Sequence, residues 1–261
     1  MNISYGFIED IGQRTSMEDA HAFYHVPEKL FFSAEIYDGH GGKRAAQIAA
    51  EMLTPCFLRL WKMEAQKPLK ERRGESELLR QSYMEVDDHI LDTGVESGTT
   101  AATFYIIDKK FIASNVGDTR VIIGTKAGVD LLTVDHKPSL PEERSRIEEL
   151  GGKILGYGIP RVQGILAVSR ALGDVGLKPF VTCEPRVVEG HLGMENDFVV
   201  LACDGVWDVL NPQDVIQIAR SAENPRDGAR QIKEKALDCG STDNISVIVL
   251  DLRNYLQTSN K

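Results

Sequence analysis

The hydrophobic positions of the chain fall mainly into short runs rich in Val, Ile, Phe and Tyr, which are bounded by Gly, Asp and Asn. This pattern is typical of β-strands joined by turns. It predicts strands at residues 3–7, 22–26, 30–37, 101–107, 111–116, 121–123, 131–134, 161–162, 166–169, 186–189, 198–203 and 245–252. The strands follow one another in groups and do not alternate strictly with helices, so we expect mostly antiparallel sheets.

Helical periodicity is found in fewer places and predicts helices at residues 42–53, 75–93, 211–219 and 227–239. Pro55 marks the end of the first helix or a break in it. A further helix is expected to begin with a capping box of Ser139 and Glu142, with Pro141 in its first turn. We therefore expect an α+β protein whose helices pack on the outer faces of its sheets.

The stretch 151–182 is rich in glycine and only weakly patterned, which predicts a flap or small subdomain. The chain has no internal repeat and no low-complexity segment. Its 261 residues fit one large layered domain or two small ones. We expect a single domain over residues 1–261 that carries this flap.

The composition narrows the class of protein. The net charge of −9 disfavours nucleic acid and anionic membranes as partners. No apolar run approaches the ~20 residues that cross a bilayer, and the first residues lack the features of a signal peptide. The four cysteines form no C-x-x-C pair, so neither a zinc motif nor an oxidising compartment is indicated. We expect a monomer in the cytoplasm, with the nucleus as a second location.

Aspartates stand where four apolar runs begin or end. Asp38, Asp118 and Asp204 follow such runs beside a glycine, and Asp243 precedes one beside an asparagine. Any single Asp-Gly pair is usually only a turn. Strands of one sheet system end close together, however, and converging carboxylates repel one another unless a cation lies between them. Oxygen ligands favour Mg²⁺ or Mn²⁺, and no His or Cys cluster offers zinc as an alternative.

A pair of such ions suits the hydrolysis of a phosphate ester, because it can activate water and neutralise the phosphate. Arg14 precedes the acidic pair Glu18-Asp19, and its planar guanidinium could bind the phosphate. His40, beside Asp38, is the histidine best placed to protonate a leaving alcohol. A lone histidine is usually structural, so the residues alone leave both interpretations of His40 open.

Eight short motifs follow one another along the chain: Arg14-Thr-Ser-Met-Glu18-Asp19, Asp38-Gly-His40-Gly-Gly42, Ser97-Gly-Thr-Thr-Ala101, Asn115-Val-Gly-Asp118-Thr-Arg120, Asp135-His-Lys-Pro138, Ser169-Arg-Ala-Leu-Gly-Asp174, Asp204-Gly-Val-Trp-Asp208 and Asp243-Asn-Ile-Ser246. In this order they resemble the metal-dependent protein phosphatases of the 2C class, in the form of the eukaryotic branch. The resemblance extends from about Tyr5 to Leu250. It implies a four-layer αββα sandwich of two stacked, mostly antiparallel sheets flanked by helices.

The resemblance also implies a serine/threonine phosphoprotein phosphatase with two Mg²⁺ or Mn²⁺ ions and a weaker third. Asp38 would bridge the two ions, and Asp204 and Asp243 would complete the first site. The carbonyl of Gly39, and Glu18 through water, would serve the second site. The resemblance further implies that Asp118 and Asp204 form the third site. It also implies that Arg14 binds the phosphoryl group and that His40 is the general acid.

Other motif residues are expected to be structural. The segments 97–101 and 135–138 would shape turns and the core, with His136 only a weaker alternative to His40. Asp208 is expected to be structural, and Asp174 to serve either the third site or a turn. Two rival functions remain: a pseudo-phosphatase that only binds, and another two-metal enzyme such as a phosphodiesterase or nuclease. The intact ligand positions argue against the first, and the acidic charge argues against a nuclease.

Overall fold

Two five-stranded sheets form the centre of the protein. The computed structural model describes residues 3–258, so the predicted domain limits at 1 and 261 lie outside the described residues. The first sheet has the order β1-β15-β14-β8-β9 and the second the order β13-β7-β6-β3-β2. Neighbouring strands of both sheets pair antiparallel, which confirms the predicted α+β class and antiparallel sheets.

The bounds of these elements follow the predicted runs closely. The first sheet contains β1 (Ser4–Asp10), β8 (Arg120–Thr125), β9 (Gly128–Leu131), β14 (Asn196–Ala202) and β15 (Ile245–Asp251). The second contains β2 (Ala20–Val26), β3 (Phe31–Tyr37), β6 (Ala101–Ile107), β7 (Lys110–Val116) and β13 (Arg186–His191). The helices are α1 (Arg44–Glu64), α2 (Glu75–Asp92), α3 (Pro141–Glu149), α4 (Asp204–Trp207), α5 (Pro212–Ser221), α6 (Pro225–Asp238) and α7 (Arg253–Thr258).

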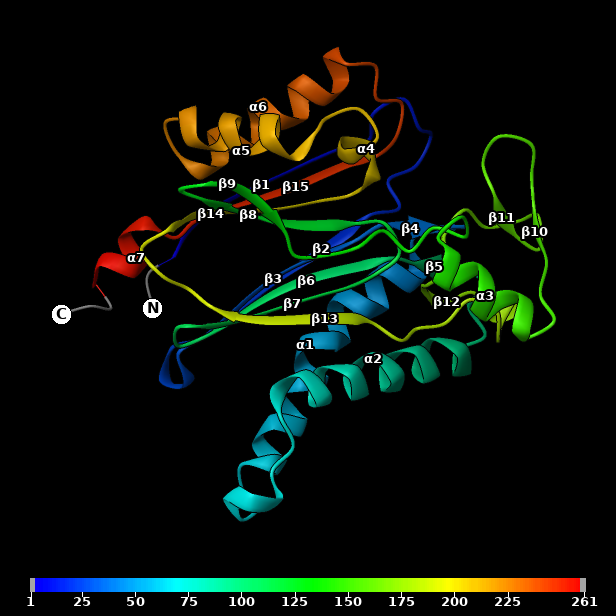
Figure 1. The fold of residues 1–261 in the computed structure, drawn as a ribbon, viewed down its shortest axis with the longest axis horizontal. Helices are drawn as coiled ribbons and strands as arrows, with labels where there is room; N and C mark the ends of the chain where they lie inside the picture. The colour runs from blue at the N-terminus through cyan, green and yellow to red at the C-terminus, as the bar shows by residue number, and fades with distance from the viewer. Residues whose placement is uncertain (1–2, 259–261) are drawn as a thin grey trace.

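Strand β3 shows how side-chain alternation builds the layers. Phe32, Ala34 and Ile36 lie in the apolar cluster between the two sheets, with residues of β14 and β15. Phe31 and Tyr37 lie in a second cluster with α1 and α2, because successive strand residues point to opposite faces. A third cluster packs the first sheet against α4, α5 and α6. From top to bottom, Figure 1 accordingly shows helices, a sheet, a sheet and helices.

Pro55 does not end the first helix, which excludes one of the two alternatives that the sequence left open. Helix α1 continues through Pro55 to Glu64. Proline cannot donate the backbone hydrogen bond that the carbonyl of Glu51 would receive in a regular helix. The hydroxyl of Tyr24 lies 3.4 Å from this carbonyl oxygen and 3.2 Å from that of Ala50, and donates there instead. Burial of Phe57 beyond the proline helps to hold the helix together.

The helix starts were predicted with mixed success. The capping box is wrong, because α3 begins after Leu140 without a side-chain cap, although Pro141 does lie in the first turn. Helix α5 begins at Pro212, one residue after the predicted 211, and the side-chain oxygen of Asn211 caps it by accepting from the backbone N–H of Asp214 at 2.9 Å. Helix α6 begins two residues before the predicted 227, where Asn224 supplies the cap.

Two predicted strands are also wrong. Strand β9 ends at Leu131, and beyond it the hydroxyl of Thr133 accepts from the backbone N–H of Val121 in place of a regular ladder bond. Residues 166–169 form no strand, and Leu166 makes only an isolated bridge to Val162. Within 151–182, β10 (Ile154–Leu155) pairs instead with β11 (Arg161–Val162).

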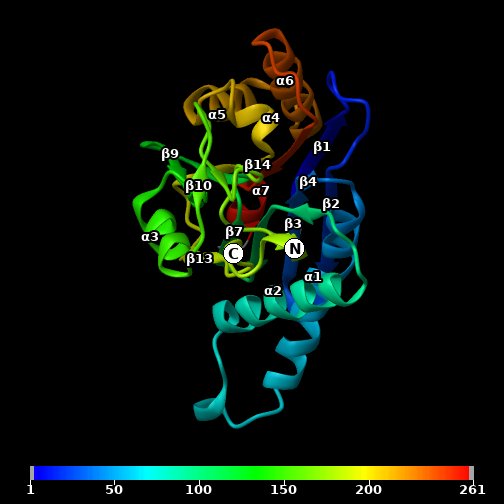
Figure 2. The ribbon, with the colours of Figure 1, turned by 90° about the vertical axis from the view of Figure 1, so that its right-hand side faces the viewer.

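A small three-stranded sheet, which the sequence did not predict, lies at one end of the sandwich. Its order is β12-β5-β4, formed by β12 (Leu172–Gly173), β5 (Gly98–Thr99) and β4 (Gly39–His40). Figure 1 places this sheet, the β10–β11 segment and α3 at the same end, and Figure 2 looks onto that end. Among residues 3–258, no helix has the length and apolar character needed to cross a membrane.

Candidate metal centre

The strand topology brings the predicted acidic residues to one end of the two sheets. Asp38 follows β3, and Asp118 comes soon after β7, which runs in the same direction two positions away in the sheet. In the other sheet, Asp204 follows β14 and Asp243 precedes β15. Because β14 and β15 are antiparallel neighbours, the end of one lies beside the start of the other. Residues distant in the sequence therefore meet at this end.

All eight residues predicted for the site line one cavity of about 380 Å³. They are Arg14, Glu18, Asp38, Gly39, His40, Asp118, Asp204 and Asp243. One carboxylate oxygen each from Asp38, Asp118 and Asp204 lies within 4.8 Å of the others. Oxygen donors at this spacing are the ligand set that Mg²⁺ and Mn²⁺ prefer, so the residues fit the implied ions.

The electrostatics of this group also favour a cation. Burial, reinforced by the charges of Asp204 and other nearby aspartates, raises the pKa of Asp38 well above its usual range. Burial and the charge of Asp118 likewise raise the pKa of Asp204 to about 7. Buried carboxylates crowded together favour their protonated form, and a divalent cation between them removes that penalty.

Arg14 and Asp243 lie at the rim of the cavity and contact each other. Nη2 of Arg14 is 2.5 Å from Oδ2 of Asp243. The other oxygen of Asp243 accepts from the backbone N–H of Asn244 at 2.7 Å. The side chain of Arg14 is 58% exposed, so its remaining N–H groups can reach an incoming anion. Asp243 lines the cavity but does not belong to the close group of three carboxylates.

The loop after β3 is packed tightly against Glu18. A Cβ atom on Gly39 would lie 2.3 Å from the backbone oxygen of Glu18, so only glycine fits there. The carboxylate of Glu18 accepts from the backbone N–H of Gly42 at 2.9 Å and from the hydroxyl of Ser16 at 3.0 Å. These bonds hold Glu18 against the loop that carries Asp38.

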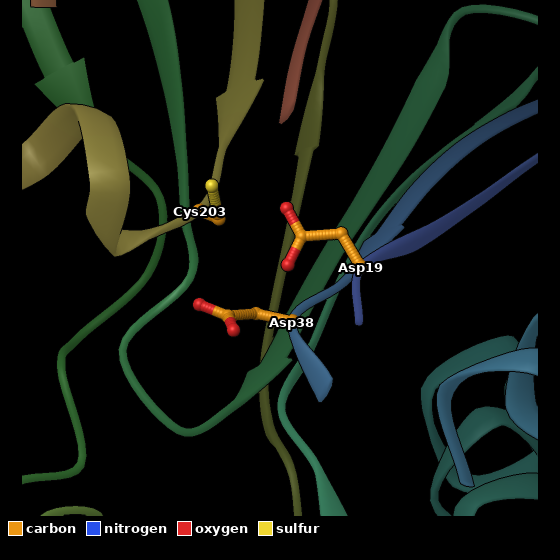
Figure 3. Close-up of side chains that lie close together, drawn as sticks. All are labelled: Asp19, Asp38 and Cys203. Atoms are coloured by element: carbon orange, nitrogen blue, oxygen red, sulfur yellow. The ribbon is translucent and has the colours of Figure 1, made fainter. Parts of the chain in front are cut away.

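Asp19 was noticed in the sequence only as half of an acidic pair, and the structure places it beside Asp38. The two carboxylates and the sulfur of Cys203 lie within 4.8 Å of one another. Figure 3 shows both carboxyl groups extending toward the strand end that carries Cys203. Oδ2 of Asp19 accepts from the hydroxyl of Ser246 at 2.7 Å, whereas its buried Oδ1 has no partner within residues 3–258. Burial raises the pKa of Asp19 to about 6.

Cys203 does not behave as a metal ligand in this group. Burial raises the pKa of its thiol well above the ordinary value, so the sulfur keeps its proton. The thiol donates to the backbone oxygen of Asn244 at 3.3 Å. Its sulfur also accepts from the backbone N–H of Ser246 at 3.1 Å. Cys203 is therefore a small buried residue at the end of an apolar strand.

The segment 135–138 is only partly structural, which corrects the expectation from the sequence. Asp135 pairs with Arg120 at 2.6 and 2.7 Å, and His136 is buried with its Nδ1 3.2 Å from the carbonyl oxygen of Gly117. Burial, then the charge of Arg170, lowers the pKa of His136 to about 4, so at neutral pH it is a neutral imidazole and not the imidazolium that a general acid requires. Lys137, in contrast, lines the cavity and forms an ion pair with Asp118.

Asp208 and Asp174 both lie near the centre. Asp208, for which the sequence predicted a structural role, lines the same cavity, and burial raises its pKa. Asp174 contacts His40: Nε2 of the histidine lies 2.8 Å from each carboxylate oxygen. The spacing of Asp174 and His40 along the chain gave no signal of this contact, because 134 residues separate them.

The fold and this oxygen-lined centre define a sandwich protein with a candidate site for divalent cations, and comparison with known proteins identifies the family. The family model described as protein phosphatase 2C matches residues 3–245. "Probable protein phosphatase 2C 59" of Arabidopsis thaliana is 32% identical over 95% of this chain and 79% of its own length. "Probable protein phosphatase 2C 52" of Oryza sativa subsp. japonica is 34% identical over 97% of this chain. This chain spans only 51% of the rice protein.

Solved structures agree with this assignment. A Caenorhabditis elegans sex-determining protein superposes with a TM-score of 0.87 over 100% of this chain and 68% of its own, at 29% sequence identity. A serine-threonine phosphatase 2C from Toxoplasma gondii superposes with a TM-score of 0.80 over 95% of this chain and 94% of its own. At 23% identity, the latter supports the fold alone. The chain belongs to the protein phosphatase 2C family.

Proposed function

We propose that this chain is a Mg²⁺- or Mn²⁺-dependent phosphatase that acts on phosphoserine and phosphothreonine in proteins. The observation that carries this proposal is the single cavity that unites the carboxylates with Arg14 and His40. Family membership supports the same reaction.

Each group of residues in the cavity would have its own role in the reaction. Asp38, Asp204 and Asp243, with the carbonyl of Gly39 and with Glu18 through water, would hold two divalent ions. When bound, such ions supply an activated water and neutralise the phosphate charge. Arg14, exposed at the rim, binds and orients the phosphoryl group through its free N–H groups. His40 gives a proton to the serine or threonine oxygen as it leaves.

A third, weaker ion would bind between Asp118 and Asp204. Lys137 already forms an ion pair with Asp118, so an ion at this place must compete with the ammonium group. This competition is a physical reason for the lower affinity of the third site.

The proposal also covers the partners, oligomeric state and location of the enzyme, and the role of its flap. The net charge of −9 supports a protein that binds neither nucleic acid nor anionic membranes, and we propose a monomer in the cytoplasm or nucleus. The stretch 151–182 is proposed as a flap that contributes to substrate choice. Arg161 and Leu166, from this stretch, line the metal cavity.

Assays with matched substrates test the proposal. Phosphoserine and phosphothreonine peptides should be hydrolysed with added Mn²⁺ or Mg²⁺, and activity should vanish after exhaustive chelation and return with metal. A phosphodiester such as bis-p-nitrophenyl phosphate serves as the control substrate. Faster turnover of the diester than of the peptides, or full activity without metal, would contradict the proposal. Metal binding in calorimetry without any hydrolysis would instead indicate a pseudo-phosphatase.

A further inference from the structure

The small sheet at the end of the sandwich places the side chains of His40 and Asp174 on either side of Gly98, which has no side chain. His40 in β4 pairs with Gly98 in β5, and Gly98 pairs in turn with Gly173 in β12. Asp174 directly follows Gly173. Because Gly98 in the central strand is a glycine, no side chain separates those of His40 and Asp174.

The two side chains make a close polar contact. Both carboxylate oxygens of Asp174 lie 2.8 Å from Nε2 of His40. A carboxylate can only accept, so Nε2 is the donor, which fixes the proton on that nitrogen. Asp174 is only 7% exposed, and burial limits the competition of water for this bond. We propose that Asp174 is a positioning residue that orients the imidazole of His40 for its proton transfer. This inference rests on the proposed general-acid role of His40.

Gly98 is a requirement of this arrangement. A Cβ atom at position 98 would lie 2.1 Å from Oδ2 of Asp174 and 2.4 Å from Nε2 of His40. Real Cβ atoms do not approach other atoms this closely, so any other residue would force the pair apart. Gly98 therefore contributes to the positioning of His40 as well as to strand β5.

The carboxylate of Asp174 is itself held in place. Asp174 has a left-handed backbone with φ of 53°, which an aspartate adopts more readily than most residues. The preceding N–H, of Gly173, donates to the buried carboxylate of Asp87 in α2 at 2.7 Å. The other oxygen of Asp87 accepts from Lys178 at 2.8 Å. Helix α2 thus fixes the turn that presents Asp174 to His40.

The position of Asp174 separates this role from that of a metal ligand. Asp174 and His40 together line a second cavity, of about 530 Å³, which adjoins the metal cavity through His40, Gly41, Arg161 and Leu166. The carboxylates that approach one another in the metal cavity are those of Asp38, Asp118 and Asp204. Asp174 therefore acts on the reaction through His40.

The contact has a mechanistic consequence. With Nε2–H donated to Asp174, the proton available to the substrate is the one on Nδ1. His40 begins as the imidazolium, with a proton on each ring nitrogen. A water oxygen forms its bond to phosphorus as the bond between phosphorus and the serine or threonine oxygen breaks, and the electron pair of the broken bond stays on that oxygen. The oxygen then takes the Nδ1 proton, which leaves His40 as the neutral imidazole with its proton on Nε2.

The test compares Asp174→Asn with His40→Ala on two substrates at saturating Mn²⁺. Asparagine tolerates the left-handed backbone but does not provide a carboxylate acceptor. We expect kcat on a phosphopeptide to fall ~10–100-fold, the usual cost of losing a residue that orients a histidine. Loss on p-nitrophenyl phosphate should be within about threefold, because nitrophenolate leaves without a proton. Asp108→Asn is the matched control, since Asp108 also has a left-handed φ, of 52°, but lies at the far end of β6.

The double variant His40→Ala/Asp174→Asn distinguishes positioning from a general structural effect. If Asp174 acts through His40, the double variant should be no slower on the phosphopeptide than His40→Ala alone. Mn²⁺ affinity by calorimetry should be unchanged in Asp174→Asn. Additive losses, equal losses on both substrates or weakened metal binding would overturn the inference.

A second variant keeps the inference testable if Asp174→Asn folds poorly. Gly98→Ala should separate the pair and reproduce the selective loss on the phosphopeptide, whereas an unaffected rate would contradict the proposal. The His40→Ala variant distinguishes a failure of this inference from a failure of the proposed function. Equal losses on both substrates in that variant would refute the general-acid role itself. A selective loss in His40→Ala but not in Asp174→Asn would refute only the role of Asp174.

Discussion

Glu35 lies in β3 of the second sheet, on the face that packs against α1 and outside the lining of the metal cavity, and it should make the stability of the protein depend on pH. Its side chain is fully buried in β3. The hydroxyls of Ser33 and Tyr37 donate to it at 2.9 and 2.5 Å, and Thr54 of α1 donates as well. Burial outweighs these donors and raises the pKa of Glu35 to about 7, from an ordinary value of 4.5.

The sign of the effect follows from the raised pKa. The folded state retains the proton of Glu35 up to about pH 7, whereas the unfolded chain loses it near 4.5. The protonated group therefore contributes fully to stability below pH 4.5, and this contribution is lost as the pH rises through about 7. A difference of this size corresponds to about 3 kcal/mol in the free energy of unfolding.

Glu35→Gln is the perturbation that tests this reasoning, because glutamine resembles the protonated carboxyl and cannot ionise. Denaturant unfolding of both proteins should be followed between pH 4.5 and 8 in chelator, so that metal binding does not contribute. The variant should gain up to about 3 kcal/mol relative to the wild type as the pH rises across this window. Subtracting the two curves removes the effects of other groups, such as Asp19, Asp204 and His136.

Glu51→Gln, on the exposed face of α1, controls for the loss of a surface charge. It should give a curve parallel to that of the wild type. Parallel curves for Glu35→Gln and the wild type would refute the raised pKa of Glu35.

Three further predictions concern the active centre. Asp38→Ala, Asp204→Ala and Asp243→Ala should each remove most of the phosphatase activity and weaken Mn²⁺ binding in calorimetry while circular dichroism shows a retained fold; near-normal turnover in one of them would mean that this residue is no ligand. Arg14→Ala should raise KM for a phosphomonoester by ~10-fold or more, since a charge-assisted hydrogen bond contributes about 1.5–3 kcal/mol, and unchanged kcat/KM would remove Arg14 from the site. Ile165→Ser, at an exposed flap residue that lines the second cavity, should change kcat/KM among phosphopeptides more than the rate on p-nitrophenyl phosphate; identical effects on all substrates would argue against a role of the flap in substrate choice.

The sequence by itself determined most strands and the identity of the acidic residues at their ends. Alternating and continuous apolar runs specify strands through local side-chain direction, so β3, β6 and β7 lie close to their predicted limits. An aspartate beside a glycine at a strand end is likewise a local signal, which is why Asp38 and Asp204 could be singled out. The eight motifs then indicated the family, to which the chain does belong.

Only the tertiary structure decided which side chains meet across the chain. Helix α1 passes through Pro55 because the hydroxyl of Tyr24, on strand β2, donates to the carbonyl oxygens of Ala50 and Glu51 near the missing backbone hydrogen bond. Lys137 reaches Asp118, and Asp174 reaches His40 across Gly98, through pairings that bring together residues far apart in the sequence. Such contacts depend on strand order, register and the absence of a side chain at one position. Local periodicity carries none of this information, because it reports only which face of its own element a residue occupies.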